Sequence, residues 1–303
     1  MKPKIVLIKD IRLYDDQIER INQLGDVVYP EKSPNSSDEW LGQCKGADII
    51  CSGKMGLNSD KLYELKNVFI TVPFVGVEFL NKNKMLENNI SVAISPGGNT
   101  EVVTEWIIGL LLTYFRKLPR LIRTENKNRS EVLETTTSLY DKNITILGAG
   151  RIGKNLGKVC ESFGMNVNIF ARGDDLIKSV KNADIIANCL STNPSSENLL
   201  DSTFFNSLKK GSFFISSSNS KTYNIESLKN ALNNNILIGA ADDAGGAQVG
   251  DTTEKDYQSL LSHPKILVTP HIAWNADAEQ RKSCDMMIDN IEAWINKKPI
   301  NLF

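Results

Sequence analysis

Short apolar runs alternate with amphipathic stretches along the first part of this chain. Strand-length runs occur at residues 5–8, 27–29, 48–51, 68–72 and 91–94, and helical patterns separate them at 15–24, 38–45 and 81–88. This alternation predicts a parallel α/β sheet. The cluster Pro96-Gly-Gly-Asn99 follows the last of these runs and predicts a crossing into a second domain.

A second series of strand candidates follows the crossing. These runs lie at 144–147, 167–170, 183–190, 211–216, 236–241 and 266–268, and they predict a doubly wound domain of six to seven strands. Thr100 suits a helix N-cap and Glu101 suits a first turn, so we expect a long helix from Thr100 to about Arg123. Residues 276–294 form an amphipathic helical pattern with no strand after it, and we expect this helix to pack on the first domain.

Composition places the chain among ordinary globular proteins. It has 303 residues, of which 41% are hydrophobic, so it can bury a sizeable core and we expect two domains. Its formal net charge of -1 and its pI of about 6.2 give no electrostatic footprint for nucleic acid or an anionic membrane. The first apolar run is too short for a signal peptide, so we expect a cytoplasmic protein.

The cysteines and the longest apolar segment refine this picture. The five cysteines lack the paired spacing of a zinc site, and we expect buried, reduced thiols and no bound metal. Residues 106–115 are apolar nearly all round but fall far short of the about 20 residues that span a bilayer. We therefore expect a buried helix, covered by the domain core or by a second subunit, no membrane partner, and a homodimer.

A glycine-rich turn carries the most specific chemical signal. An apolar strand at 144–147 leads into Gly148-Ala-Gly150-Arg-Ile-Gly153, and a helical pattern follows to residue 163. In a dinucleotide-binding turn the first glycine permits the tight turn, the second lets the backbone approach a pyrophosphate, and the third allows close helix–strand packing. The helix N-terminus offers unpaired N–H groups to the phosphates. The turn in this context predicts a dinucleotide cofactor.

The end of the following strand bears on which dinucleotide binds. Sites that prefer NAD usually place an acidic residue there, about 20 residues after the turn, to bind the ribose 2′-OH. Here the strand ends in Ala171 and Arg172. The guanidinium of Arg172 is suited to a 2′-phosphate, so we expect NADP. NAD is the alternative, with Asp174 or Asp175 binding the ribose.

Five blocks, taken in order, resemble the D-isomer-specific 2-hydroxyacid dehydrogenase family. They are V-G-V-E at 75–78, N-T-E-V-V-T-E at 99–105, G-A-G-R-I-G at 148–153, L-K-K-G-S-F-F-I at 208–215 and V-T-P-H-I-A at 268–273. The resemblance covers nearly the whole chain. It implies an α/β protein with two doubly wound parallel-sheet domains: a Rossmann coenzyme domain at 99–275, inserted into a flavodoxin-like substrate domain built from 1–98 and 276–303.

The resemblance also implies the site residues and a small-molecule substrate. Gly76 and Val77 correspond to substrate-binding positions of the family, and Asp243 to the aspartate that commonly meets the nicotinamide amide. The full set of implied cofactor contacts comes from the glycine turn and from later strand ends: Gly148, Gly150, Arg151, Ile152, Gly153, Arg172, Leu190, Pro194, Ser217 and Asp243.

The family's reaction is hydride transfer between a nicotinamide and a 2-oxo or 2-hydroxy acid. It uses an arginine for the substrate carboxylate, a histidine as the acid for the developing alkoxide, and a glutamate that orients the histidine. His271 matches the acid. The arginine position falls on Asn219 and the glutamate position on Gly246. Loss of such a cation costs a few kcal/mol of transition-state stabilisation, or about two to three orders of magnitude in rate.

Three interpretations follow. In the first, the protein is an active reductase whose cation comes from Lys54 or Lys221, or whose substrate depends less on its carboxylate and is bound by Asn219 and its neighbouring serines. In the second, it is a catalytically impaired cofactor-binding sensor. In the third, it is a weak, generic 2-hydroxyacid dehydrogenase in which the alignment around the glycine-rich loop is shifted, and Asp242, Asp251 or Glu254 supplies the carboxylate to His271.

Overall fold

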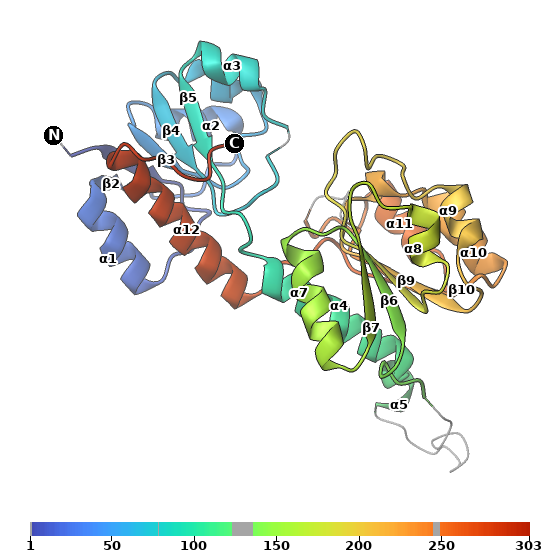
Figure 1. The fold of residues 1–303 in the computed structure, drawn as a ribbon. Helices are drawn as coiled ribbons and strands as arrows, with labels where there is room; N and C mark the ends of the chain where they lie inside the picture. Colours follow the sequence, from blue (N-terminus) through green and yellow to red (C-terminus); the bar gives the residue numbers. More distant parts are fainter. Residues whose placement is uncertain (1, 78, 123–135, 245–248) are drawn as a thin grey trace. The chain divides into compact units, whose positions relative to one another are not determined.

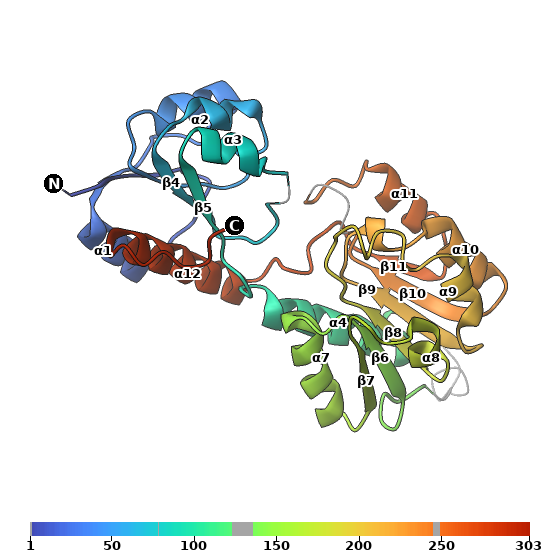
Figure 2. The ribbon, with the colours of Figure 1, turned by 45° about the horizontal axis from the view of Figure 1, so that its top comes forward.

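The computed structural model describes residues 2–77, 79–122, 136–244 and 249–303 (Figures 1 and 2). The chain divides into two compact units. We call Met1–Asn99 together with Ala276–Phe303 the N-terminal unit, and Thr100–Asn275 the central unit. The last helix therefore belongs with the first part of the chain, and the chain passes between the units at residues 99–100 and 275–276.

A parallel sheet of five strands forms the middle of the described N-terminal unit. Its order is β2 (Asp26–Val28), β1 (Lys4–Leu7), β3 (Ile49–Cys51), β4 (Val68–Thr71) and β5 (Ile90–Ala93). Every neighbouring pair is parallel. This is the flavodoxin-like order 2-1-3-4-5, which confirms the predicted fold of this domain.

Helices cover both faces of that sheet. One face packs against α2 (Ser37–Cys44), the 3-10 helix η1 (Asp60–Glu64) and α3 (Lys82–Glu87), with Trp40 as a fully buried side chain. The other face packs against α1 (Asp15–Leu24) and α12 (Asp277–Ile295), where Ile21, Met287 and Ile288 are fully buried. The apolar strands are thus enclosed on both sides, as a doubly wound sheet requires.

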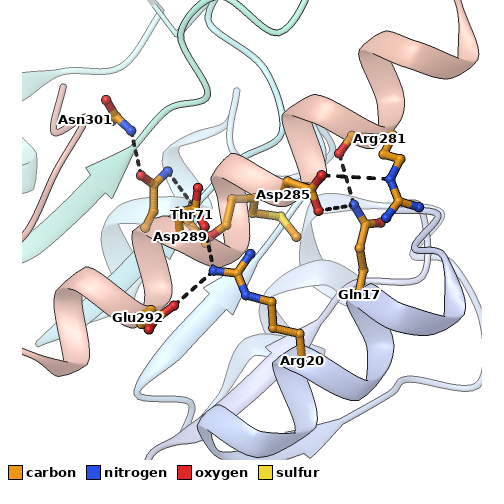
Figure 3. A network of polar contacts seen from close by, with 10 residues as sticks. Gln17, Arg20, Thr71, Arg281, Asp285, Asp289, Glu292 and Asn301 are labelled. Carbon is orange, nitrogen blue, oxygen red and sulfur yellow. Dashed lines mark hydrogen bonds and ion pairs between the residues drawn. The ribbon is translucent and has the colours of Figure 1, made fainter.

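Polar contacts between α1 and α12 accompany this apolar packing (Figure 3). Gln17 Nε2 donates to Asp285 Oδ1 at 2.7 Å. Arg20 Nη2 donates to Asp289 Oδ1 at 2.5 Å and to Glu292 Oε2 at 3.0 Å. Such half-exposed charges add little free energy, so burial of apolar side chains is what chiefly holds α12 on this unit.

A parallel sheet of six strands forms the middle of the described central unit. Its order is β11 (Ile266–Val268), β10 (Leu237–Asp242), β9 (Ser212–Ser216), β8 (Ile185–Asn188), β6 (Asn143–Leu147) and β7 (Asn166–Phe170). The order reverses at β6, since β7 lies on one side and β8 on the other. Ligands of doubly wound sheets bind at the carboxyl ends of the strands beside such a switch point.

Both faces of the second sheet are also covered. α4 (Thr100–Phe115) and α7 (Arg151–Ser162) pack on one face. The other face carries α8 (Leu176–Val180), α9 (Ser202–Ser207), α10 (Ile225–Asn233) and α11 (Lys255–Leu261). Figure 2 shows these helices on opposite sides of the strands. The predicted doubly wound Rossmann-like domain is therefore confirmed.

The prediction of one helix from Thr100 to about Arg123 is wrong. α4 ends at Phe115, Lys117 has the left-handed backbone angle φ 53°, and a short helix, α5 (Leu118–Leu121), begins after it. Pro119 lies in the first turn of α5, where a proline is tolerated, but it would break a continuous helix. Among the described residues no helix is long and apolar enough to cross a membrane.

Candidate active site

The glycine turn lies at the carboxyl end of β6, and each glycine occupies a different environment. Gly148 has φ 113°, and a Cβ there would lie 2.7 Å from the carbonyl oxygen of Cys189. A Cβ on Gly153 would lie 1.9 Å from the carbonyl oxygen of Gly148. The start of α7 therefore lies so close to the end of β6 that no side chain fits between them. A Cβ on Gly150 would meet nothing within 4 Å. This open space is where a pyrophosphate would approach the backbone.

The N-terminus of α7 is also suited to a phosphate. Gly150 is the N-cap and has no side chain to cap the helix, and Arg151 begins it with an exposed side chain. Lys154 N–H, the first to bond within the helix, donates to the carbonyl of Gly150. The N–H groups before it, including that of Ile152, are the ones that bind anions in such turns. The residues present therefore fit a dinucleotide.

The end of β7 presents one exposed cation and two carboxylates that serve their own backbone. Arg172 is exposed. Asp174 Oδ2 accepts from the N–H of Ala171 at 2.8 Å, and Asp175 caps α8 by accepting from the N–H of Lys178 at 3.0 Å. Gly173 takes φ 101°, which permits this tight turn. Both aspartates that would serve NAD are thus engaged in local turns.

Three further predicted cofactor contacts follow β8 and β9. Leu190 is half-buried, and its N–H donates to Asn188 Oδ1 at 3.3 Å. Pro194 is exposed in the loop after β8. Ser217 lies directly after β9, and its N–H donates to the carbonyl of Asn188 at 3.1 Å. Because the strands are parallel, these residues share one sheet edge with the glycine turn.

Asp243 holds the segment that carries His271. Its Oδ1 accepts from Thr269 Oγ1 at 2.5 Å and from the N–H of Ile272 at 2.9 Å, and its Oδ2 accepts from the N–H of Ala273 at 2.8 Å. Asp243 is 3% exposed, and burial raises the pKa of its carboxyl although these hydrogen bonds lower it. Both oxygens are therefore engaged within the protein, and the expected contact with the nicotinamide amide stays a prediction.

His271 has an unusual backbone conformation. Its φ is 54°, in the left-handed region, where a residue other than glycine is held by its surroundings. Its N–H donates to the carbonyls of Asp243 at 2.6 Å and Thr269 at 3.0 Å, and its own carbonyl accepts from Trp274 Nε1 at 3.1 Å. The half-buried imidazole thus follows β11 on a constrained turn at the same sheet edge as the glycine turn.

Asn219 begins the 3-10 helix η2 (Ser220–Thr222) after β9. Its Oδ1 accepts from the N–H of Lys221 at 2.9 Å, and its carbonyl accepts from Thr222 Oγ1 at 2.9 Å. Lys221 is exposed and, with Ser220, lines a surface pocket of about 350 Å³. The position of the family arginine is therefore occupied by a neutral side chain that caps a turn.

The structure assigns different roles to the carboxylates considered for His271. Asp242 accepts from Tyr223 and Asp251 accepts from Thr253, whereas Glu254 stands at the N-cap position of α11 without a side-chain capping bond. Asp243 is instead the carboxylate that holds the His271 segment. Sequence reasoning missed this role; the available signal was the Asp242-Asp243 pair at a strand end, where successive side chains point to opposite faces of the sheet and so take different surroundings. Gly246 lies outside the described residues.

The remaining predicted residues belong to the N-terminal unit. Lys54 is exposed after β3, with Nζ 5.7 Å from the centroid of the Phe74 ring. Its loop is anchored by Trp40, whose Nε1 donates to Ser52 Oγ at 2.9 Å. Gly76 is half-buried and Val77 is buried in the loop after β4. All of them follow the carboxyl ends of their strands, where ligands of such sheets bind.

No group of side chains within the described ranges is arranged to hold a metal ion. The described residues offer a dinucleotide turn and a constrained histidine at the carboxyl ends of the strands. Together with the doubly wound sheet, these features define a nucleotide-dependent oxidoreductase.

Comparison with known proteins names the family. The model of the D-isomer specific 2-hydroxyacid dehydrogenase NAD binding domain matches residues 108–273. A D-lactate dehydrogenase of Staphylococcus aureus (strain MRSA252) is 28% identical over 267 residues, which cover 80% of this chain and 81% of the relative. The chain belongs to the D-isomer-specific 2-hydroxyacid dehydrogenase family, and it is an NAD(P)-dependent enzyme of the dehydrogenase and reductase type found there.

Solved structures share the fold. An acyclic imino acid reductase in complex with NADPH and D-Arg has a TM-score of 0.81 at 21% identity, with 99% of each chain covered. A D-isomer specific 2-hydroxyacid dehydrogenase from Lactobacillus delbrueckii ssp. bulgaricus, in its NAD complexed form, has a TM-score of 0.76 at 17% identity, again over 99% of each chain. The fold therefore accommodates both cofactors.

Proposed function

We propose that this protein is an NADP-preferring reductase in which His271 is the acid that protonates a 2-oxo acid or a related carbonyl compound. The observation that carries this proposal is the set of hydrogen bonds by which the Asp243 carboxylate fixes the segment around His271. This segment lies at the carboxyl ends of the strands, where the glycine turn also lies. A surface histidine of no function needs no left-handed backbone held by a buried carboxylate.

The roles of the protein groups follow from this arrangement. The nicotinamide supplies the hydride when the cofactor is bound. The His271 imidazolium donates a proton to the oxygen on which negative charge develops. Asp243 keeps the His271 segment in place through hydrogen bonds to Thr269, Ile272 and Ala273. A group held in this way loses little entropy when it reacts.

Arg172 supports the choice of NADP. A guanidinium binds a phosphate through charge-assisted hydrogen bonds, and Arg172 is exposed at the end of β7. Asp174 and Asp175 lie beyond the strand end, and one oxygen of each accepts a backbone N–H of its own turn, which favours Arg172 as the group that meets the ribose.

The substrate of such a site differs from that of an arginine-containing dehydrogenase. Asn219 has no charge to hold a carboxylate, and its side-chain oxygen already caps η2. We propose Lys54 as the replacement cation, because it is exposed at the carboxyl edge of the N-terminal sheet beside Phe74. Without such a cation, the preferred substrate is a carbonyl compound that depends less on its carboxylate.

A kinetic survey tests this function. NADPH oxidation is measured with a panel of 2-oxo acids and aldehydes in the native protein and in three single variants, His271→Ala, Lys54→Ala and Lys221→Ala. Loss of the acid lowers kcat by about 10²–10⁴-fold. The Lys54 change raises KM for carboxylate substrates, whereas the Lys221 change leaves it unaltered. An active protein whose rate survives His271→Ala overturns the proposed acid.

The neutral Asn219 also favours a second candidate, a cofactor-binding sensor without turnover. This alternative predicts tight NADPH binding and no oxidation with any substrate of the panel. The same survey therefore separates it from the reductase.

The assembly and the compartment are part of the proposal. α4 is apolar over most of its surface, and Trp106, Leu110 and Leu112 remain only half-buried within a single chain, which supports a homodimer. The cysteines are free thiols, which supports a reducing cytoplasm. Light scattering of the purified protein gives the mass of the assembly, and a monomeric mass contradicts the proposed homodimer.

A further inference from the structure

A buried tyrosine–aspartate pair adjoins the segments that carry Asn219 and Asp243. Tyr223 Oη donates to Asp242 Oδ2 at 2.8 Å, and the N–H of Ala244 donates to Asp242 Oδ1 at 2.6 Å. Asp242 is 0% exposed and Tyr223 is 3% exposed. The reaction proposed above uses neither side chain. A buried carboxylate is costly unless it is hydrogen-bonded, so its presence here calls for a reason.

The pair joins the two segments that carry the proposed site residues. Asp242 ends β10 and directly precedes Asp243, and its carbonyl accepts from the N–H of Thr269 at 2.9 Å. Tyr223 directly follows the turn that Asn219 begins, and its ring packs edge-on against Phe214 of β9. The Tyr223–Asp242 hydrogen bond therefore connects the Asn219 turn to the segment that holds His271.

We propose that Tyr223 and Asp242 are positioning residues, which keep the Asn219 turn and the Asp243–His271 segment in register through the hydrogen bonds that an ionised Asp242 accepts. The catalytic meaning of this inference rests on the proposed function, whereas the coupling itself does not.

Protonation weakens this coupling. An ionised Asp242 accepts from Tyr223 Oη and from the N–H of Ala244 as a charged acceptor. Protonation removes that charge and adds an O–H to one of the two oxygens, so both hydrogen bonds become weaker. Ala244 has φ 47°, so the hydrogen bond from its N–H, which becomes weaker, also restrains a residue in the left-handed region.

The ionisation of Asp242 falls in an accessible range. Burial raises its pKa to about 7, helped by the neighbouring Asp243 and opposed by hydrogen bonds from Tyr223, Ala244 and Ser216. Burial and the nearby carboxylates of Asp242 and Asp256 raise the pKa of Tyr223 well above 10, so Tyr223 remains the donor. The coupling is therefore strongest above neutral pH and weakens in mild acid.

Trp274 offers a reporter that needs no substrate, because its Nε1 donates to the carbonyl of His271. Tryptophan emission is titrated with pH in the full-length His271→Gln protein, so that the imidazole itself contributes nothing. We expect a transition near pH 7. Adding Trp274→Phe abolishes this transition, which assigns the signal to the His271 segment.

Variants of the pair then decide the assignment. Tyr223→Phe removes a bond that favours the carboxylate, so the midpoint moves to higher pH, and Asp242→Asn removes the transition. Tyr257→Phe is the matched control, because Tyr257 is buried in the same core. Among the described residues, the hydrogen bonds to the Asp242 carboxylate come from Tyr223, Ala244 and Ser216. A transition that survives Asp242→Asn, or a midpoint that Tyr223→Phe leaves in place, overturns the proposal.

Kinetics extend the test to the proposed reaction. With an active substrate, the fall of kcat in mild acid shifts to higher pH in Tyr223→Phe, while KM for NADPH stays constant. A fall of kcat that does not shift contradicts the positioning role. If no substrate is turned over, the proposed function fails, and the emission titration still decides whether the pair couples the two segments.

Discussion

The backbone N–H of His271 donates to the carbonyl oxygen of Asp243 at 2.6 Å, so the proposed acid is tied directly to the residue whose carboxylate holds the rest of its segment. The carboxylate here acts on the backbone around the histidine, and the constraint is visible in the left-handed φ of 54°.

Asp243→Asn tests this role. The amide nitrogen replaces one acceptor oxygen, so the N–H of Ala273 or of Ile272 loses its partner. Because hydrogen bonds to a buried charge contribute about 1.5–3 kcal/mol each, we expect a stability loss of that order and a fall in kcat of about 10–100-fold. Chemical denaturation and steady-state kinetics measure both. If NADPH affinity falls and stability does not change, Asp243 contacts the cofactor and does not hold the His271 segment.

Two glycines of the turn provide a matched comparison. Gly150→Ala places its Cβ in open space at an ordinary φ of -74°, so we expect a stability loss below about 1 kcal/mol. Gly153→Ala places its Cβ against the carbonyl of Gly148, which must move, and we expect a loss of about 1–3 kcal/mol. Both changes weaken cofactor binding in calorimetric titration. Normal NADPH binding by Gly150→Ala refutes the expected approach of the pyrophosphate.

Arg172→Glu addresses the choice of cofactor. Loss of a charge-assisted bond to a 2′-phosphate raises the Kd of NADPH by about 10–100-fold, and the reversed charge raises it further. NADH lacks that phosphate, so its Kd stays the same. Lys158→Glu makes the same charge change on the exposed side of α7 and controls for general electrostatics. Equal losses for both cofactors in fluorescence titration rule out the proposed contact.

Asp242 predicts an unusual pH dependence of stability. Its folded pKa of about 7 lies above the ordinary value of 3.8, so between these values the folded protein holds a proton that the unfolded chain releases. Asp242 therefore contributes a fall in the free energy of unfolding of up to about 1.4 kcal/mol per pH unit as pH rises from about 4 to about 7. Asp242→Asn removes this slope, which urea denaturation at several pH values measures. Parallel curves for the two proteins contradict the assignment.

Local patterns in the sequence predicted much of this molecule. The strand runs and their alternation with helices determined two parallel sheets, because strand and helix periodicities are properties of neighbouring residues. The pattern did not predict the helix break at Lys117, because Pro119 is compatible with the first turn of a separate helix as well as with the end of the preceding one.

The candidate site, like the fold, was predicted from the sequence only in part. The amino-acid sequence alone determined the glycine turn, the cation at Arg172 and the presence of His271, because each of these depends on residue types at short spacing. Only the tertiary structure decided which carboxylate serves the histidine and that Asp242 pairs with Tyr223. Those partners lie in or after different strands, and the register of β9, β10 and β11 brings them together through hydrogen bonds that no local pattern encodes.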